Sequence, residues 1–93
     1  MIQSFKCKET GRIFHGLISR KFPANIQGRA FNKLTAIHAS NALEDLRTPT
    51  SNHLEKLSGD KEGQYSIRIN DKYRVCFKWH GNSASDVEIT NYH

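Results

Sequence analysis

Residues 64–80 read QYSIRINDKYRVCFKWH, and this stretch decides the fold. Its apolar and aromatic residues recur at every second position, at Tyr65, Ile67, Ile69, Tyr73, Val75, Phe77 and Trp79. A period of two indicates strands that bury one face of a sheet. The Asn70-Asp71 dipeptide between the two runs is typical of a turn. The stretch therefore predicts a pair of antiparallel strands.

Two more strand-like runs flank this pair, LEKL at 54–57 and DVEITNY at 86–92. Turn residues separate the neighbouring runs, at Gly59-Asp60 and Gly81-Asn82. From residue 54 onward the chain therefore predicts four successive strands.

The chain before residue 40 has helical periodicity. Residues 9–20 carry one apolar stripe and predict a helix, with Ile13, Phe14, Leu17 and Ile18 on the stripe. Pro23 opens a second helix that is predicted to run to about His38, with a stripe of Ile26, Ala30, Leu34 and Ile37 and a place for Phe31 beside it. Arg29 and Lys33 lie on its other face, where a solvated surface is the preferred interpretation over RNA binding.

Residues 1–6 alternate in polarity and predict a short first strand, whereas residues 40–53 are interpreted as a connector. The resulting order is β-α-α-β-β-β-β. It predicts an α+β fold in one domain of residues 1–93, with two N-terminal helices packed on one face of a small twisted, mostly antiparallel sheet.

Composition narrows the class of partner. The 93 residues include 14 Lys and Arg against 9 Asp and Glu, a net charge of +5, which favours a polyanion such as nucleic acid. An acidic protein or an anionic membrane would be attracted by the same charge. Lys6 and Lys8 precede any apolar run, and no run approaches the ~20 residues of a membrane span, so we expect a cytoplasmic protein. Cys7 and Cys76 are expected to be reduced thiols.

The second face of the predicted sheet carries basic residues. Arg68, Arg74 and Lys78 alternate with the apolar residues and are predicted to lie on an open face. Ordinary polar-out alternation explains this pattern. A phosphate-binding floor explains it as well, because guanidinium matches phosphate with two parallel hydrogen bonds. The pattern alone leaves both readings open.

Several motifs carry a family resemblance. Residues 55–79, EKLSGDKEGQYSIRINDKYRVCFKW, contain an L-x-G-D turn, a Y-S-I-R-I-N strand and a Y-R-V-C-F strand, the chain opens with M-I-x-S-F, and it ends with VEITNYH. In these motifs it resembles HigB-type toxins of the RelE/ParE superfamily, also known as plasmid maintenance killer proteins. The resemblance spans nearly the whole chain.

The resemblance implies a function. It implies a RelE-like microbial RNase fold and the toxin of a type II toxin–antitoxin system, a ribosome-dependent endoribonuclease that cleaves messenger RNA in the decoding site. The implied partners are a HigA-like antitoxin, the ribosome and mRNA, with no membrane. The toxin itself is expected to be a monomer that enters larger complexes through the antitoxin.

The implied chemistry needs no metal or cofactor. RNA supplies its own nucleophile, the 2′-hydroxyl, so the protein has only to transfer protons and stabilise the charged phosphorane. We find no metal-ligand spacing of His and Cys and no carboxylate cluster for magnesium in the sequence. This route would make DNA a poor substrate.

The resemblance also nominates site residues. Arg74 matches the family's arginine on the penultimate long strand and suits the phosphorane, and Arg68 is a second candidate, for binding more than for catalysis. His93 is a candidate general acid beside its own α-carboxylate, although a frayed chain end is the alternative. Tyr92 can stack on a base or orient a phosphate, or else cap the core. Asn91 replaces an aspartate that is frequent in the family, and asparagine cannot act as a base.

The region from 53 to 61 adds further basic candidates. His53 is a candidate general base and lies slightly upstream of the histidine that some members of the family carry in this region. Lys56 is the alternative match, and Lys56, Lys61 and Lys78 are predicted to bind RNA with Arg68. The histidines at 15, 38 and 80 are interpreted as structural or solvent-facing.

Two rival functions remain open. ParE-type toxins share the architecture but poison DNA gyrase without being nucleases, and the Arg74 and Tyr92-His93 matches argue against that alternative. A non-catalytic basic module that binds nucleic acid or an antitoxin is the second, and the Asn91 departure favours it.

Overall fold

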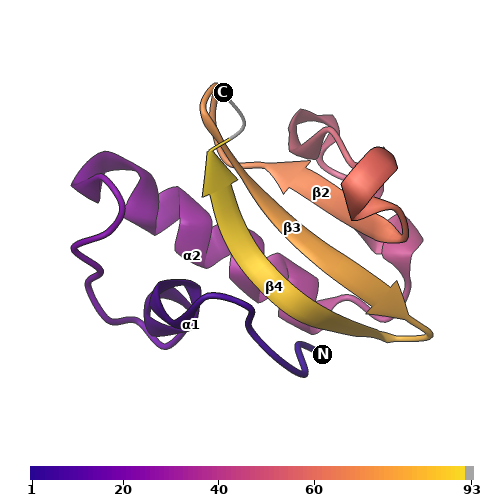
Figure 1. The fold of residues 1–93 in the computed structure, drawn as a ribbon, viewed down its shortest axis with the longest axis horizontal. Coiled ribbons are helices and arrows are strands. Elements are labelled where there is room, and N and C mark those ends of the chain that lie inside the picture. The colour runs from indigo at the N-terminus through magenta and orange to yellow at the C-terminus, as the bar shows by residue number, and fades with distance from the viewer. Residues whose placement is uncertain (92–93) are drawn as a thin grey trace.

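The computed structural model describes residues 1–91 and has the predicted α+β architecture (Figure 1). Two α-helices, α1 (Lys8–Phe14) and α2 (Ala24–Ala39), pack against one face of the sheet. Within residues 1–91 the sheet has four antiparallel strands in the order β1-β2-β3-β4, namely β1 (Glu55–Lys56), β2 (Gln64–Arg68), β3 (Tyr73–His80) and β4 (Ser83–Asn91). The connector holds the short 3-10 helices η1 (Leu43–Arg47) and η2 (Thr50–Asn52), and η3 (Gly59–Lys61) precedes β2.

The predicted strand pair forms the centre of the sheet. In the β2–β3 pairing, Ile67 lies opposite Val75 and Arg68 lies opposite Arg74. The turn is closed by Asn70, whose side-chain Oδ1 accepts hydrogen bonds from the backbone N–H groups of Lys72 and Tyr73, both at 2.9 Å. Asparagine therefore shapes this turn by local hydrogen bonding to the backbone.

The core lies between this sheet and α2. The four predicted stripe residues of α2 are all buried, and Phe77 and Val75 of β3 face them from the sheet, so the predicted periodicities are confirmed for these elements. Phe31, which the prediction placed beside the stripe, is 40% exposed. No helix in the described part of the chain is long and apolar enough to cross a membrane.

The first helix is shorter than predicted, and the prediction of a helix over residues 9–20 is wrong beyond Phe14. Gly16 adopts a positive φ of 81° and donates to the carbonyl of Ile13, while Leu17 donates to the carbonyl of Arg12 at 2.9 Å. These bonds form a glycine-terminated helix end, which satisfies the last carbonyl groups and turns the chain away. Leu17 and Ile18 consequently leave the apolar stripe and are exposed.

The predicted strand at residues 1–6 is replaced by two isolated parallel bridges to β4, at Ile2 and Phe5. A register shift of the β3–β4 pairing lies between these bridges, and Asp86 adopts a positive φ of 50° there. A bulge of this kind bends the edge of the sheet and interrupts regular pairing. The N-terminal segment therefore pairs on either side of the bulge without forming a continuous strand.

Both cysteines are free, as expected. Cys76 is buried in β3, and Cys7 is half-buried at the start of α1, where Lys21 Nζ lies 3.5 Å from its Sγ. Burial alone would raise the pKa of the Cys7 thiol, but hydrogen bonds from Thr10, Glu9 and Lys21 outweigh it and lower the pKa below the ordinary value.

Candidate functional site

A polar cleft of about 570 Å³ opens where α2, the connector and the β2–β3 turn meet. The helix, the connector and the turn all contribute to its lining, with Arg29, Asn32, Lys33, Ser51, His53, Arg68, Ile69, Asn70 and Asp71. In Figure 1 the end of β4 lies beside the β2–β3 turn, in agreement with the pairing of Tyr73 with Asn91. The cleft therefore lies at the same end of the sheet as Asn91, the last residue of β4.

Two basic residues reach the cleft from α2, Arg29 and Lys33, which are one helical turn apart. Lys33 Nζ donates a hydrogen bond to Asn52 Oδ1 of η2, and Asn52 is itself buried. Burial lowers the pKa of the Lys33 ammonium, and the positive charge of Arg29 lowers it further. The negative charge of a phosphate bound beside these two residues would favour the charged ammonium and so oppose both causes of the lowered pKa.

Arg68 reaches the cleft from the end of β2. Its guanidinium Nη2 pairs with the carboxylate of Asp71, which is almost fully exposed. Exposed ion pairs of this kind contribute only about 0–1 kcal/mol, because water competes for both partners. A phosphate group can therefore replace Asp71 on Arg68 at little cost.

Arg74 lies on the predicted face of the sheet, but the expectation that this face leaves it open is wrong. The residue is 8% exposed, and Nε donates to Ser66 Oγ at 2.8 Å while Nη2 donates to the carbonyl oxygen of His53 at 2.6 Å. Glu55 of β1 lies opposite Ser66, and its carboxylate is 3.6 Å from Nη1 of Arg74. The connector and β1 thus cover this part of the face.

The hydrogen bond from Arg74 holds the backbone of His53 in place. His53 follows η2 in a left-handed conformation with φ 46°, and the residue lines the cleft while its carbonyl accepts the hydrogen bond from Arg74. The predicted residues Arg68, Arg74 and His53 therefore lie together, although His53 is separated from the other two by more than ten residues of sequence. Arg74 thus fixes the backbone of His53 next to the cleft.

The other predicted basic residues lie elsewhere in the described part of the chain. Lys78 is four residues from Arg74 along β3, about 13 Å at the usual rise of a strand, and pairs with Asp86 at 3.2 Å. Lys56 lies opposite Tyr65, on the face that the helices cover, and is exposed at the sheet edge. Lys61 belongs to η3. Their predicted contacts with RNA are not supported by this arrangement and stay predictions.

Asn91 ends β4 opposite Tyr73, one residue after Thr90, which lies opposite Arg74. Tyr92 and His93, the predicted stacking residue and general acid, lie outside the described residues. Their roles stay predictions, and the position of Asn91 shows only that the last described residue of β4 is next to the partner of Arg74.

Arg29 and Lys33 are the residues that sequence reasoning assigned to a merely solvated face. The signal that points to them is their spacing of four along one side of α2, beside its apolar stripe. This spacing is equally common on solvated helices. Only the fold shows that the connector and Arg68 face the same two residues.

The arrangement can bind a polyanion and hold it near a histidine. Three permanent or near-permanent cations, Arg29, Lys33 and Arg68, face one carboxylate, Asp71, across an open polar cleft. Guanidinium groups bind phosphate in two-point contacts, and His53 supplies an imidazole, a side chain that commonly transfers protons in enzymes. Among residues 1–91 no three His, Cys, Asp or Glu side chains are grouped to hold a metal ion.

Comparison with known proteins adds a family relationship. The family of RelE-like toxins of the HigB type II toxin–antitoxin system matches residues 3–93. Toxin HigB-1 of Vibrio cholerae serotype O1 is 42% identical over 60 residues, which cover 64% of this chain and 63% of that toxin. The matched stretch is thus less than two thirds of the Vibrio toxin.

Two further relatives match over more of their length. A Haemophilus influenzae protein named as uncharacterized is 37% identical over 75 residues, which cover 81% of this chain and 74% of that protein. Endoribonuclease HigB of Proteus vulgaris is 29% identical over 93 residues, and the match covers 100% of this chain and 100% of that protein. The name of the last relative states an activity on RNA.

Proposed function

The chain belongs to the RelE-like HigB toxins of type II toxin–antitoxin systems, and on that premise we propose that it is an endoribonuclease that cleaves messenger RNA in the decoding site of the ribosome. Its partners are then the ribosome with its mRNA and an antitoxin that restrains it. Since ribosomes are its target, its place of action is the cytoplasm.

One observation carries this proposal, the cleft in which Arg29, Lys33 and Arg68 surround His53. Three cations on two separate elements suit a polyanion with several phosphates, such as an RNA strand, because each cation can contact a phosphate of the backbone. An arginine beneath the histidine, Arg74, holds the histidine's backbone in place. The cleft therefore binds a strand of RNA and presents one proton-transfer group to it.

The reaction follows from the chemistry of RNA. A base removes the proton of the 2′-hydroxyl, the oxygen attacks the adjacent phosphorus, and the bond to the 5′-oxygen breaks after that oxygen receives a proton. We assign the base to His53 and the acid to His93. Tyr92 orients the base or phosphate, and Asn91 orients a neighbouring group by hydrogen bonding, because its amide cannot take a proton. Arg68 and Arg74 stabilise the phosphorane charge.

The dependence on the ribosome has a physical reason. The described part of this cleft offers one histidine and no carboxylate other than Asp71, which Arg68 already holds. A site with so few proton-transfer groups gains greatly when the ribosome holds the codon ready for in-line attack. Alignment of the reacting groups alone can lower an activation barrier by as much as ~7–11 kcal/mol.

The direct test maps new 5′-ends of mRNA in a translating extract. Wild-type protein is expected to produce ends within codons and in frame, and none when ribosomes are removed. His93→Ala is expected to lower this cleavage by about 100-fold or more, because a positioned general acid contributes roughly 10²–10⁴-fold.

His80→Ala is the matched control, since His80 is an exposed histidine at the far end of β3. Growth arrest with intact messages would contradict the proposal and indicate a gyrase poison. Neither arrest nor cleavage would indicate a binding module without catalysis.

The lowered pKa of Lys33 predicts a pH effect on RNA binding. The ammonium binds phosphate and the neutral amine does not, so affinity for an RNA oligonucleotide is expected to fall as the pH rises through this pKa, at a lower pH than for an ordinary lysine. Loss of one charged contact corresponds to roughly tenfold in affinity. Fluorescence anisotropy between pH 7 and pH 10 measures it.

Lys33→Arg is expected to remove this fall, because guanidinium stays charged throughout that range. Lys72→Arg is the control, since Lys72 is exposed in the β2–β3 turn and does not line the cleft. An identical pH profile for wild type and Lys33→Arg would show that Lys33 does not contact the RNA.

A further inference from the structure

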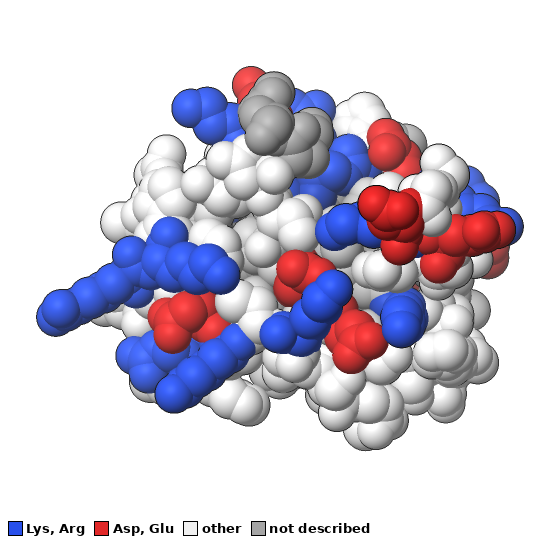
Figure 2. Space-filling model, in the orientation of Figure 1, with Lys and Arg blue, Asp and Glu red and all other residues white. Residues whose placement is uncertain are grey.

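A second basic surface lies on α1 and the loop after it, away from the cleft. It surrounds a shallow hollow of about 770 Å³, and we call it the α1–loop surface, lined by Lys8, Glu9, Arg12, Ile18, Arg20 and Lys21. Figure 2 shows Lys and Arg side chains gathered over α1 and the chain next to it, at the lower left. None of these six residues lines the cleft described above.

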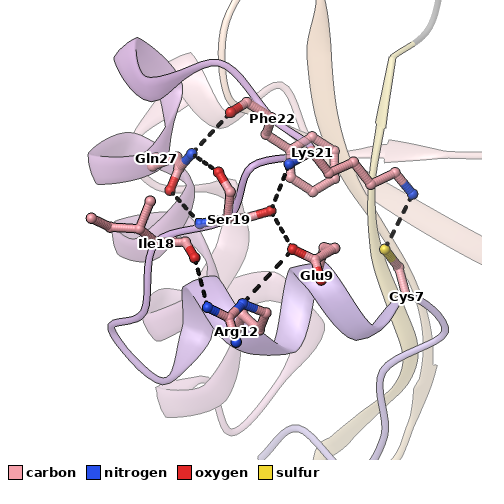
Figure 3. Close-up of polar contacts among 8 residues, drawn as sticks. All are labelled: Cys7, Glu9, Arg12, Ile18, Ser19, Lys21, Phe22 and Gln27. Atoms are coloured by element: carbon pink, nitrogen blue, oxygen red, sulfur yellow. Dashed lines mark hydrogen bonds and ion pairs between the residues drawn. The ribbon is translucent and has the colours of Figure 1, made fainter.

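The loop that forms this surface is held in place by a hydrogen-bond network around Ser19 (Figure 3). The Ser19 hydroxyl donates to Glu9 Oε1 at 2.7 Å, and its backbone N–H donates to Gln27 Oε1 at 3.0 Å. Gln27 Nε2 in turn donates to the carbonyl groups of Ser19 and Phe22. Because Ser19 is 2% exposed, this network ties the loop to both helices from within.

An exposed aliphatic side chain, that of Ile18, projects from this loop. Ile18 is 77% exposed, and Leu17 before it is 51% exposed. The backbone of Ile18 is anchored, since its carbonyl accepts a hydrogen bond from Arg12 Nη2 at 3.0 Å, and its side chain points away from the network in Figure 3. A partner that covers Ile18 therefore gains apolar burial without first ordering the loop.

The charge of the surface is strongly positive. Its four cations are Lys8, Arg12, Arg20 and Lys21, and its one carboxylate, Glu9, is already shared between Ser19 and Arg12, with Arg12 Nε at 3.8 Å. Charge complementarity therefore calls for an acidic partner.

We propose that the α1–loop surface binds an acidic protein segment that carries an apolar anchor residue, and that this segment belongs to the antitoxin. The cations alone would suit RNA as well. The apolar pair decides for a protein, because aliphatic side chains add little to a phosphate contact, whereas a central apolar anchor ringed by charges is the common arrangement of a protein interface. The identification of the partner as an antitoxin rests on the family and on the proposed function. The acidic and apolar character of the segment is inferred from the surface itself.

The test measures the affinity of the purified antitoxin for the wild-type toxin and four variants by isothermal titration calorimetry. Ile18→Asp and the double variant Arg20→Glu with Lys21→Glu are expected to weaken binding at least ~10-fold each, because one removes the anchor and the other reverses two charges. Phe31→Asp and Arg47→Glu are the matched controls, an exposed apolar residue and an exposed cation outside this surface, and are expected to bind as wild type does.

Melting temperatures establish that each variant is folded, and mRNA cleavage without antitoxin is measured in parallel. Unchanged affinity in both surface variants, or an equal loss in the controls, would overturn the proposal. So would a loss of cleavage with retained antitoxin affinity, which would assign the surface to RNA. Weakened antitoxin binding in a protein that never cleaves RNA would leave this surface standing and reject the proposed nuclease instead.

Discussion

Replacing Arg74 with alanine is expected to lower ribosome-dependent mRNA cleavage by about 100-fold or more and to lower the free energy of unfolding by about 1–3 kcal/mol. The first effect follows from the proposed role of Arg74 as a fixed cation that stabilises the phosphorane, since single groups that stabilise developing charge contribute roughly 10²–10³-fold. The second follows because Ser66 Oγ and the carbonyl of His53 lose their donor in a site that is almost closed to water.

Arg74→Lys separates the two effects. Lysine keeps the charge but cannot reach both acceptors with a planar fork, so a partial recovery of the cleavage rate with little recovery of stability is expected. The rate is measured at saturating ribosome concentration and at a temperature where each variant is folded. Arg47→Ala is the control, because Arg47 is an exposed arginine that pairs with Glu44 on η1. A cleavage rate of Arg74→Ala equal to that of the control would remove Arg74 from the site.

The largest expected effect on stability is that of Phe77→Ala. Phe77 is completely buried at the centre of β3 and lies between the rings of Tyr65 and Trp79, with centroids 6.4 and 6.3 Å away. Truncation of such a residue costs about 3–5 kcal/mol, through lost apolar burial and the cavity that remains. Because small domains have only about 5–15 kcal/mol in total, the variant is expected to be close to unfolding at 37 °C.

Urea denaturation followed by circular dichroism measures this difference in the free energy of unfolding. Phe31→Ala is the matched control, the same substitution at a position that is 40% exposed on α2, and a cost below about 1 kcal/mol is expected there. Equal costs at the two positions would show that the sheet–helix interface is not the main source of stability.

The architecture was predictable because its signals are local and repeated. The alternation in β2 and β3 and the four-residue stripe of α2 each place several apolar side chains on one face, so no single error can reverse the assignment. The end of α1 was not predicted correctly, since the apolar residues Leu17 and Ile18 continue the helical period past Gly16. There the backbone hydrogen bonds of a glycine-terminated helix outweighed the hydrophobic pattern.

The candidate site was predictable only in part. The positions of Arg68 and Arg74 on one face of neighbouring strands follow from strand parity alone. The burial of Arg74 does not, because the residues that cover it are His53, from a connector with no periodic signal, and Glu55, from the two-residue strand β1. The same connector lies beside α2, and for this reason Arg29 and Lys33 line a cleft.

Secondary structure, the fold class, the basic character and the family of this protein thus follow from its amino-acid order, since each rests on short-range periodicity, on composition or on motifs within one stretch of chain. Which cations meet in the cleft, which arginine is enclosed and which isoleucine stays exposed beside a basic surface were decided by tertiary structure. The physical reason is that these features depend on contacts between segments far apart in the chain, and such contacts are selected by packing of the whole core rather than by the residues that make them.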